Sequence, residues 1–268
     1  MAQAKTGDSV PLDDRGLLLG DGVFETLLWD QGQLLMAGAH AARMIRGAQM
    51  LGLPAPDEAA FVACALSAVS RGGYAGGPAA VRVTFTAGSG GRGLERPATV
   101  LPRLFARASA YLAPAGPAAL ALASIRRNEA SPLSRIKSLA YLDNVLARRE
   151  AAGSGADEAV LLNTRGELAC AAVANLFWVE SGTLFTPPVE AGCLEGVTRA
   201  LVLSLAPALG VVVQLVRAPP EAIERADAVF LTNSLMGVRP AASFAGRRFE
   251  PSPLVARIAE AVASRRRG

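Results

Sequence analysis

The chain has 268 residues, and 51% of them are hydrophobic, which is enough apolar material for one large domain or for two domains of ordinary size. The formal net charge is only +4, and no basic stripe is interleaved with aromatic residues, so the composition gives nucleic-acid binding little support. The three cysteines show no CxxC spacing and there is one histidine, which argues against a disulfide framework, a zinc site or a Ser-His-Asp triad.

The sequence also gives no sign of a membrane or secretory segment. No apolar run approaches the ~20 residues of a membrane span, and the N-terminus lacks the apolar core of a signal peptide. We therefore expect a soluble, cytoplasmic protein without nucleic-acid or membrane partners and without a metal.

The first half of the chain alternates strands, helices and turn-rich loops. Residues 88–94 form a glycine-rich loop that matches neither a P-loop nor a GxGxxG motif. It is either a mobile loop that presents Arg92 to an anionic substrate or a flexible hairpin tip without function. Strands are predicted over 23–29, 79–86 and 99–111, and helices over 36–51 and from the N-cap Asp57 to about Arg71.

A proline- and glycine-rich stretch from Ala113 to Pro117 is the best linker candidate. We place an N-terminal α/β domain at 1–112, an interdomain linker at 113–120 and a C-terminal domain at 121–268. The second half is predicted as mixed α/β with many antiparallel hairpins. Its strands are expected over 118–124, 158–163, 167–171, 174–180, 183–185, 211–217 and 229–231, and its helices from about 138 to 152 and over 196–209, 221–226 and 251–266.

Lysine is rare in this sequence. Among 27 lysines and arginines, only Lys5 and Lys137 are lysines. An ammonium group can lose its proton and attack a carbonyl, whereas a guanidinium group stays protonated, so an isolated lysine suits Schiff-base chemistry. Apolar residues at helical spacing follow Lys137, which predicts that it lies where a loop enters a helix. The plainer interpretation is a solvated surface lysine.

Three further features are typical of a phosphate site. Gly196-Val197-Thr198 opens a predicted helix, where free N–H groups and the helix dipole favour an anion. Thr232-Asn233-Ser234 is a hydroxyl-bearing turn after a buried strand, and Arg43 offers a guanidinium fork. Each signal is weak by itself, since hydroxyl residues at helix starts usually only cap. Together with an isolated lysine they suit a pyridoxal-phosphate enzyme.

In its motifs the chain resembles the class IV (fold-type IV) pyridoxal-phosphate enzymes. These are the branched-chain and D-amino-acid aminotransferases and 4-amino-4-deoxychorismate lyase. The resemblance covers nearly the whole chain and implies a two-domain fold, with a small N-terminal α/β domain, a larger C-terminal mixed α/β barrel-like domain and the cofactor in the cleft between them. It also implies a homodimer. The stretches that carry it are 14–16, 20–25, His40 with Arg43, 137–142, 175–177, 196–199 and 232–235.

The resemblance implies a role for each candidate site residue. Lys137 would form the Schiff base with pyridoxal 5'-phosphate. The phosphate would be held by Arg43, Val197, Thr198 and Ser234. Leu28 replaces a basic residue that many relatives carry on the same strand, so Arg92 and Arg135 become the candidates for binding substrate carboxylates, and Glu25 is assigned with them to substrate binding.

One departure from the family pattern concerns the pyridine nitrogen of the cofactor. The family usually places a glutamate five residues before the Asn-Leu-Phe stretch, where this chain has Cys170. Glu167 lies at an odd offset along the predicted strand, so it faces the opposite side and is a poor substitute. We expect a thiol to stabilise a carbanion on the cofactor less well than a carboxylate does, which disfavours transamination.

Within the family, two stretches favour the lyase. The glycine-rich loop 88–93 and the turn 232–240 resemble those of 4-amino-4-deoxychorismate lyase, an enzyme of folate biosynthesis that releases pyruvate and 4-aminobenzoate. In this interpretation Lys137 removes a ring C–H proton as general base. The alternatives are a class IV aminotransferase acting on D-amino or branched-chain amino acids, and a non-catalytic relative that binds the cofactor.

Overall fold

A computed structural model describes residues 9–74 and 76–267. Residues 1–8 of the predicted N-terminal domain, including Lys5, lie outside the described residues, as do Ala75 and Gly268. The chain divides into two compact units. Unit 1 contains Met1–Leu112 and Ile136–Ala140, and unit 2 contains Ala113–Arg135 and Tyr141–Gly268. The chain thus returns to unit 1 for the short segment that carries Lys137.

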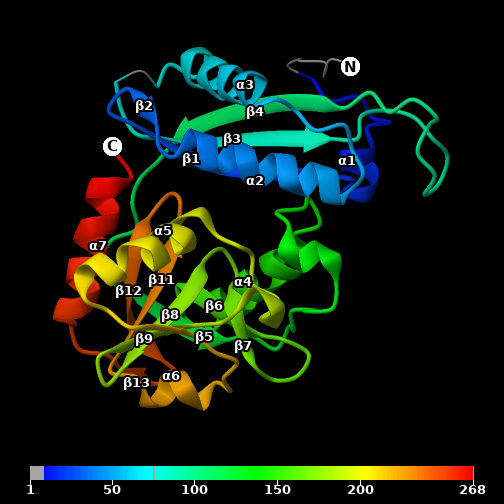
Figure 1. Cartoon of the computed structure of the whole chain (residues 1–268). Coiled ribbons are helices and arrows are strands. Elements are labelled where there is room, and N and C mark those ends of the chain that lie inside the picture. The colour runs from blue at the N-terminus through cyan, green and yellow to red at the C-terminus, as the bar shows by residue number, and fades with distance from the viewer. Residues whose placement is uncertain (1–8, 75, 268) are drawn as a thin grey trace. The chain divides into compact units, whose positions relative to one another are not determined.

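Unit 1 is an antiparallel sheet with two helices on one face (Figure 1). Alternate strand residues such as Val81, Val83 and Phe85 are buried in one core with Met44 and Phe61 of the helices. The strand order is β2 (Gln33–Leu34), β1 (Gly22–Asp30), β3 (Ala79–Thr86) and β4 (Arg103–Ala110), the covering helices are α2 (Ala37–Met50) and α3 (Glu58–Arg71), and a short helix, α1 (Arg15–Leu19), precedes β1.

The segment Ile136–Ala140 is extended and pairs with β1, so the prediction that Lys137 lies at a helix start is wrong. Phe24 donates its backbone N–H to the Lys137 carbonyl (2.9 Å), and Leu139 donates to the Gly22 carbonyl (3.0 Å). Ile136 is buried in the unit 1 core. Backbone pairing and burial therefore outweigh the helical spacing of the leucines, and the helix begins only at Leu142.

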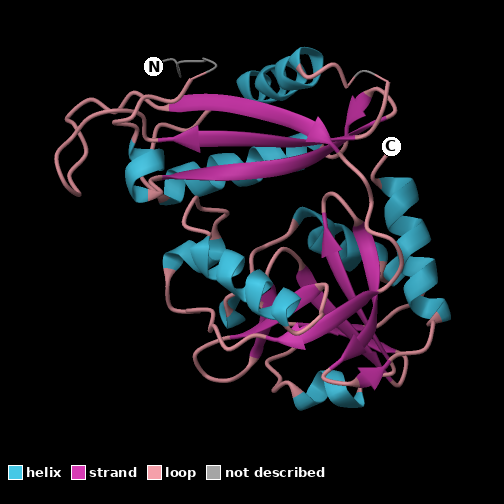
Figure 2. Ribbon diagram, turned by 180° about the vertical axis from the view of Figure 1, so that it is seen from behind, coloured by secondary structure: helices cyan, strands magenta, loops and turns pink. Residues whose placement is uncertain are grey.

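Unit 2 is built on a nine-stranded mixed sheet (Figure 2). β7, at one end of the strand order, also contacts β8 near its middle, so the sheet curls towards a half-barrel. Ala118, which the predicted linker includes, begins β5. The strands are β5 (Ala118–Leu122), β6 (Glu158–Leu162), β7 (Leu168–Ala171), β8 (Asn175–Glu180), β9 (Thr183–Thr186), β10 (Val213–Leu215), β11 (Ala228–Asn233), β12 (Gly237–Phe244) and β13 (Arg247–Arg248).

Four α-helices and three short 3₁₀ helices are described in unit 2. The last α-helix, α7, packs against β12 and α5 and buries Val255, Ile258 and Val262. Among the described helices of the whole chain, none is both long and apolar enough to cross a membrane. The helices are α4 (Leu142–Gly153), α5 (Val197–Leu205), α6 (Glu221–Arg225), α7 (Pro253–Arg265), η1 (Pro132–Arg135), η2 (Val189–Ala191) and η3 (Pro207–Leu209).

Candidate functional site

Lys137 lies on the face of the unit 1 sheet that is opposite to α2. A Cβ at Gly47 of α2 would lie 3.1 Å from Val23, so Val23 faces the helix, and its pairing partner Ser138 faces the same way. Side chains alternate along a strand, which turns Lys137 and Phe24 to the other face. There the Lys137 ammonium lies 4.2 Å from the centroid of the Phe24 ring. The Lys137 backbone is thus fixed by β1, and the residue is half-buried on the face opposite to α2.

Arg82 is a second cation on the same aromatic ring, and the sequence analysis missed it. Its guanidinium carbon lies 3.6 Å from the Phe24 ring centroid, a cation–π contact. In the sheet Arg82 is paired in register with Arg107 of β4, so both arginines lie on the Lys137 face. The sequence pattern that could have identified Arg82 is an arginine between Val81 and Val83 in a predicted strand. The structure shows that Arg82 is exposed and that both valines are buried.

On the α2 face, Glu25 is completely buried in a group with Arg43 and His40. Arg43 donates from Nε and Nη2 to the two carboxylate oxygens of Glu25 (2.7 Å each), and His40 Nδ1 lies 2.7 Å from Oε2. Burial alone would raise the pKa of Glu25, but Arg43 and His40 outweigh it and hold that pKa well below its usual value. Burial also lowers the pKa of His40, although Glu25 opposes this shift.

These contacts bear on two sequence predictions. The Glu25 carboxylate binds Arg43 and His40 beneath α2, and its side chain is 0% exposed, so the arrangement gives no support to its predicted contact with substrate. Glu25 instead orients the Arg43 guanidinium. Binding of the cofactor phosphate by Arg43 stays a prediction.

In unit 2, the start of α5 has the features of an anion site. Its N-cap, Gly196, supplies no side-chain cap, and the Thr198 hydroxyl is buried without a hydrogen-bond partner among the described residues. The Thr232 hydroxyl, near the end of β11, is likewise buried without a hydrogen-bond partner among the described residues. A Cβ at Gly196 would lie 1.9 Å from Asn175 Oδ1, so only glycine fits there. Unsatisfied hydroxyls and an uncapped helix start fit a phosphate group.

The turn between β11 and β12 is held by side chains. Asn233 Oδ1 accepts hydrogen bonds from the backbone N–H groups of Leu235 (3.0 Å) and Met236 (2.9 Å). Its amide nitrogen donates to the Val173 carbonyl (3.2 Å). Ser234, the predicted phosphate ligand of this turn, follows directly and is half-buried. Val197, Thr198 and Ser234 thus lie in two short stretches of unit 2, and their binding of the phosphate stays a prediction.

Cys170 lies in β7 and is paired with Leu161 of β6. Burial raises the pKa of its thiol, and Glu158 adds to this shift while Arg127 opposes it. The thiol therefore stays protonated near neutral pH. Glu167 is engaged elsewhere, because its carboxylate accepts hydrogen bonds from Asn163 (2.7 Å) and Arg217 (2.8 Å). The predicted position of Cys170 at the pyridine nitrogen stays a prediction.

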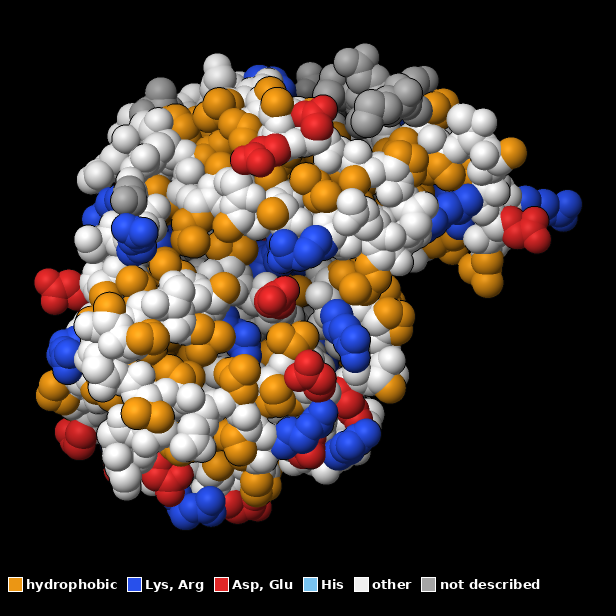
Figure 3. All heavy atoms as spheres, in the orientation of Figure 1, with side chains coloured by type: hydrophobic (Ala, Val, Ile, Leu, Met, Phe, Trp, Pro, Cys, Tyr) orange, Lys and Arg blue, Asp and Glu red, His pale blue; other side chains and the backbone are white. Residues whose placement is uncertain are grey.

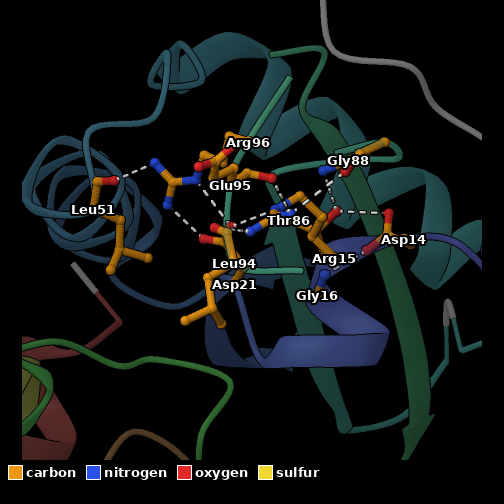
Figure 4. Close-up of polar contacts among 11 residues, drawn as sticks. Asp14, Arg15, Gly16, Asp21, Leu51, Thr86, Gly88, Leu94, Glu95 and Arg96 are labelled. Atoms are coloured by element: carbon orange, nitrogen blue, oxygen red, sulfur yellow. Dashed lines mark hydrogen bonds and ion pairs between the residues drawn. The ribbon is translucent and has the colours of Figure 1, made fainter. Parts of the chain in front are cut away.

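The glycine-rich loop is anchored at its far end by arginines (Figure 4). Arg15 donates to the carbonyls of Leu94 (2.9 Å) and Glu95 (2.8 Å), and Arg96 makes two hydrogen bonds to Asp21. These two arginines lower the pKa of Asp21, although burial opposes the shift. These contacts fix the end of the loop at residues 94–96, while Gly91, Arg92 and Gly93 are exposed, and the presentation of Arg92 to a substrate stays a prediction.

The two remaining substrate candidates are both exposed. Arg92 lies at the loop tip in unit 1, and Arg135 ends η1 in unit 2. Their contact with substrate carboxylates stays a prediction. Figure 3 shows acidic side chains among the basic ones on the pictured face.

Comparisons with known proteins show the family to which the chain belongs. Residues 22–244 match the family described as amino-transferase class IV, so the chain belongs to that family and is a pyridoxal-phosphate-dependent protein of its fold. It is 32% identical over 237 residues to aminodeoxychorismate lyase of Vibrio harveyi, covering 86% of each chain. It is also 32% identical over 247 residues to a putative branched-chain-amino-acid aminotransferase of Methanocaldococcus jannaschii, covering 89% of this chain and 83% of that protein.

A solved structure gives the same picture. A putative 4-amino-4-deoxychorismate lyase from Legionella pneumophila superimposes with a TM-score of 0.91 at 30% sequence identity, covering 98% of this chain and 99% of that one. The predicted fold class and the predicted cofactor are thereby confirmed. Lyases and aminotransferases both occur among the relatives, so the reaction itself has to be argued from the site.

Proposed function

We propose that this protein is a 4-amino-4-deoxychorismate lyase that releases pyruvate and 4-aminobenzoate. The observation that carries the proposal is the buried, protonated thiol of Cys170 at the position predicted to meet the pyridine nitrogen. Pyridoxal phosphate supplies an electron sink at the substrate amine, and that sink is strongest when a carboxylate keeps the ring nitrogen protonated. A neutral thiol suits an elimination that is driven by forming an aromatic ring better than it suits transamination.

The residues of the unit 1 sheet face have roles in this reaction. Lys137, whose backbone β1 holds beside Phe24, moves the proton in this reaction. Its amine takes a ring C–H proton, the bond between the ring and the enolpyruvyl oxygen breaks as the ring becomes aromatic, and the leaving group receives the proton on its methylene carbon and departs as pyruvate. Arg82 and Arg107 offer two cations for the two carboxylates of the substrate, the ring carboxylate and the one that leaves with pyruvate. The buried Phe24 ring contacts both cations and so keeps Lys137 and Arg82 close to each other.

The phosphate of the cofactor would be held in unit 2 by Thr198, Ser234 and the N-terminal N–H groups of α5. Arg43 is assigned to the phosphate by the family resemblance alone. Glu25 keeps the Arg43 fork in one orientation through two hydrogen bonds. The buried, partnerless hydroxyl of Thr198 supports this assignment, since a phosphate oxygen would satisfy it.

The direct test is pyruvate release from 4-amino-4-deoxychorismate without any keto-acid acceptor. We expect equal amounts of pyruvate and 4-aminobenzoate from the cofactor-loaded protein and no product from Lys137→Ala. Arg82→Ala should raise KM by about tenfold or more, the effect of removing a charge-assisted contact, while Arg46→Ala serves as a control outside the proposed site. If the folded, cofactor-loaded protein releases no pyruvate from this substrate, the result contradicts the proposal.

The second candidate is a class IV aminotransferase, which the similarity to the Methanocaldococcus jannaschii protein favours. It predicts that D-alanine or L-leucine with 2-oxoglutarate yields glutamate. Each substrate pair is therefore assayed with the same preparation. Glutamate formation without pyruvate release from aminodeoxychorismate would establish this candidate in place of the lyase.

A further inference from the structure

The C-terminal helix α7 ends on the turn that carries Ser234. Arg266, directly after the helix, donates from Nη2 to the backbone carbonyl of Ser234. The guanidinium is half-buried there, in contrast to its exposed neighbours Arg265 and Arg267. The side chain of Arg266 thus contacts the proposed phosphate-binding turn.

The turn is shaped to accept this guanidinium. Gly237 ends the turn with φ +69°, and a Cβ at that position would lie only 2.7 Å from Arg266 Nη1. The absence of a side chain at Gly237 thus leaves the space that Arg266 fills. Asn233 holds the opposite side of the turn through Leu235 and Met236, so the Ser234 carbonyl is the group that Arg266 secures.

The helix also connects the two halves of the proposed phosphate site. It packs against β12, which leaves the turn, and against α5, whose first turn contains Thr198. A second arginine of α7 makes a similar bond at the far end of α5: Arg257 donates from Nη2 to the Leu209 carbonyl (3.0 Å). The two arginines make the same kind of contact, but only Arg266 contacts the phosphate-binding turn.

We infer that Arg266 is a positioning residue for the cofactor phosphate, acting through the backbone of Ser234. The inference rests on the proposed placement of the phosphate at Ser234 and Thr198. A guanidinium group keeps its charge at every accessible pH, so it fixes the turn and also adds positive charge beside a phosphate dianion. Docking of the C-terminus therefore sets the affinity for the phosphate and not that for the pyridine ring.

The test compares two ligands on the cofactor-free full-length protein. Pyridoxal 5'-phosphate and pyridoxal, which lacks the phosphate, are titrated against wild type, Arg266→Ala and the matched control Arg257→Ala, with absorption as the readout. For Arg266→Ala we expect the dissociation constant of pyridoxal phosphate to rise about tenfold, the scale of one hydrogen bond to a charged group, and that of pyridoxal to stay unchanged. Arg257→Ala should change neither constant.

The comparison within one variant separates the positioning role from a loss of stability. If Arg266→Ala weakens both ligands equally, or neither, or if Arg257→Ala gives the same phosphate-specific loss, the inference is overturned while the proposed function stands. If the wild type binds pyridoxal phosphate no better than pyridoxal, the phosphate site itself is overturned, and the inference with it. Arg266→Lys, which keeps the charge but loses the planar fork, should recover part of the affinity.

Discussion

The completely buried carboxylate of Glu25 in β1 interacts with Arg43 and His40 of α2, and these contacts join the strand to the helix. Breaking a buried ion pair leaves the surviving charge without compensation, and such losses typically cost ~3–5 kcal/mol of unfolding free energy. We expect a loss of this size for Glu25→Gln in urea titrations of the cofactor-free protein at pH 7, because Arg43 would remain buried. The exposed Glu260→Gln serves as the control and should change stability little. An unchanged midpoint for Glu25→Gln would contradict this energetic role.

The same group of residues makes stability depend on pH. The pKa values of His40 and Glu25 are both lower in the folded protein than their ordinary values of 6.5 and 4.5. The contribution of each residue to the unfolding free energy is therefore fully present above the ordinary pKa of that residue. It is lost as the pH falls below that pKa, because the unfolded chain then binds the proton more readily than the folded protein does. We expect the unfolding free energy to fall first below pH 6.5 and more steeply below 4.5. Glu25→Gln should reduce the steeper part, to which Asp21, whose pKa is also lowered, still contributes.

Cys170 gives a residue-scale test of the choice between lyase and aminotransferase. Cys170→Glu would place a carboxylate where the family usually has one, so the amine-transfer half-reaction with D-alanine should speed up by about tenfold, a barrier change of ~1.4 kcal/mol. The pH dependence of the cofactor absorption band should change with it. Cys170→Ser keeps the site neutral and controls for size. Equal spectra and rates for both variants would remove the argument from the thiol.

At the scale of elements, the loop between β3 and β4 has separate anchor and tip functions. Arg96→Ala removes the two hydrogen bonds to Asp21 and one to the Leu51 carbonyl (2.6 Å), so residues 88–97 should exchange their amide hydrogens faster. Arg92→Ala changes only the exposed tip. It should leave exchange unaltered and raise KM if the predicted substrate contact exists. Amide exchange faster than wild type in Arg92→Ala, or unchanged from wild type in Arg96→Ala, would contradict these separate roles of the anchors and the tip.

The parts of the fold that were predicted from the sequence are those that depend on residues close together along the chain. The strand over 79–86 is β3 with the same bounds, and Asp57 caps α3 by accepting the Ala60 N–H (2.6 Å), as its sequence pattern predicts. These features depend on neighbours along the chain. The extended conformation around Lys137 was missed because its hydrogen-bond partners, Gly22 and Phe24, lie more than a hundred residues earlier.

The candidate site shows the same limit. Lys137, Arg43 and Thr198 could be selected by residue type and motif, and the structure supplies surroundings that suit their predicted roles. The participation of Arg82 and the burial of Glu25 could not be selected in that way, because they depend on strand register and on which sheet face a helix covers. The sequence analysis did not select Arg266, because its contact with the Ser234 carbonyl depends on where the end of α7 packs.

At the scale of the whole molecule, we propose that the protein is a homodimer. Exposed leucines gather in and before α1: Leu12 is 86% exposed, Leu17 59% and Leu18 63%. Such apolar surface is typical of a protein–protein interface. We expect light scattering to give the mass of two chains, and Leu18→Glu to give that of one. Leu215→Glu, at a 56% exposed leucine of β10, should leave the dimer intact. A wild type with the mass of one chain would contradict the proposal.

The segment Ile136–Ala140 also has a consequence for synthesis of the protein on the ribosome. When residue 112 has emerged, unit 1 has its helices and its four strands, but the backbone groups of β1 at Gly22 and Phe24 still lack the partners that residues 137 and 139 will bring. An unpaired strand edge on a nascent chain is a template for aggregation. Delivery of the proposed catalytic lysine and protection of this edge are therefore a single event during translation.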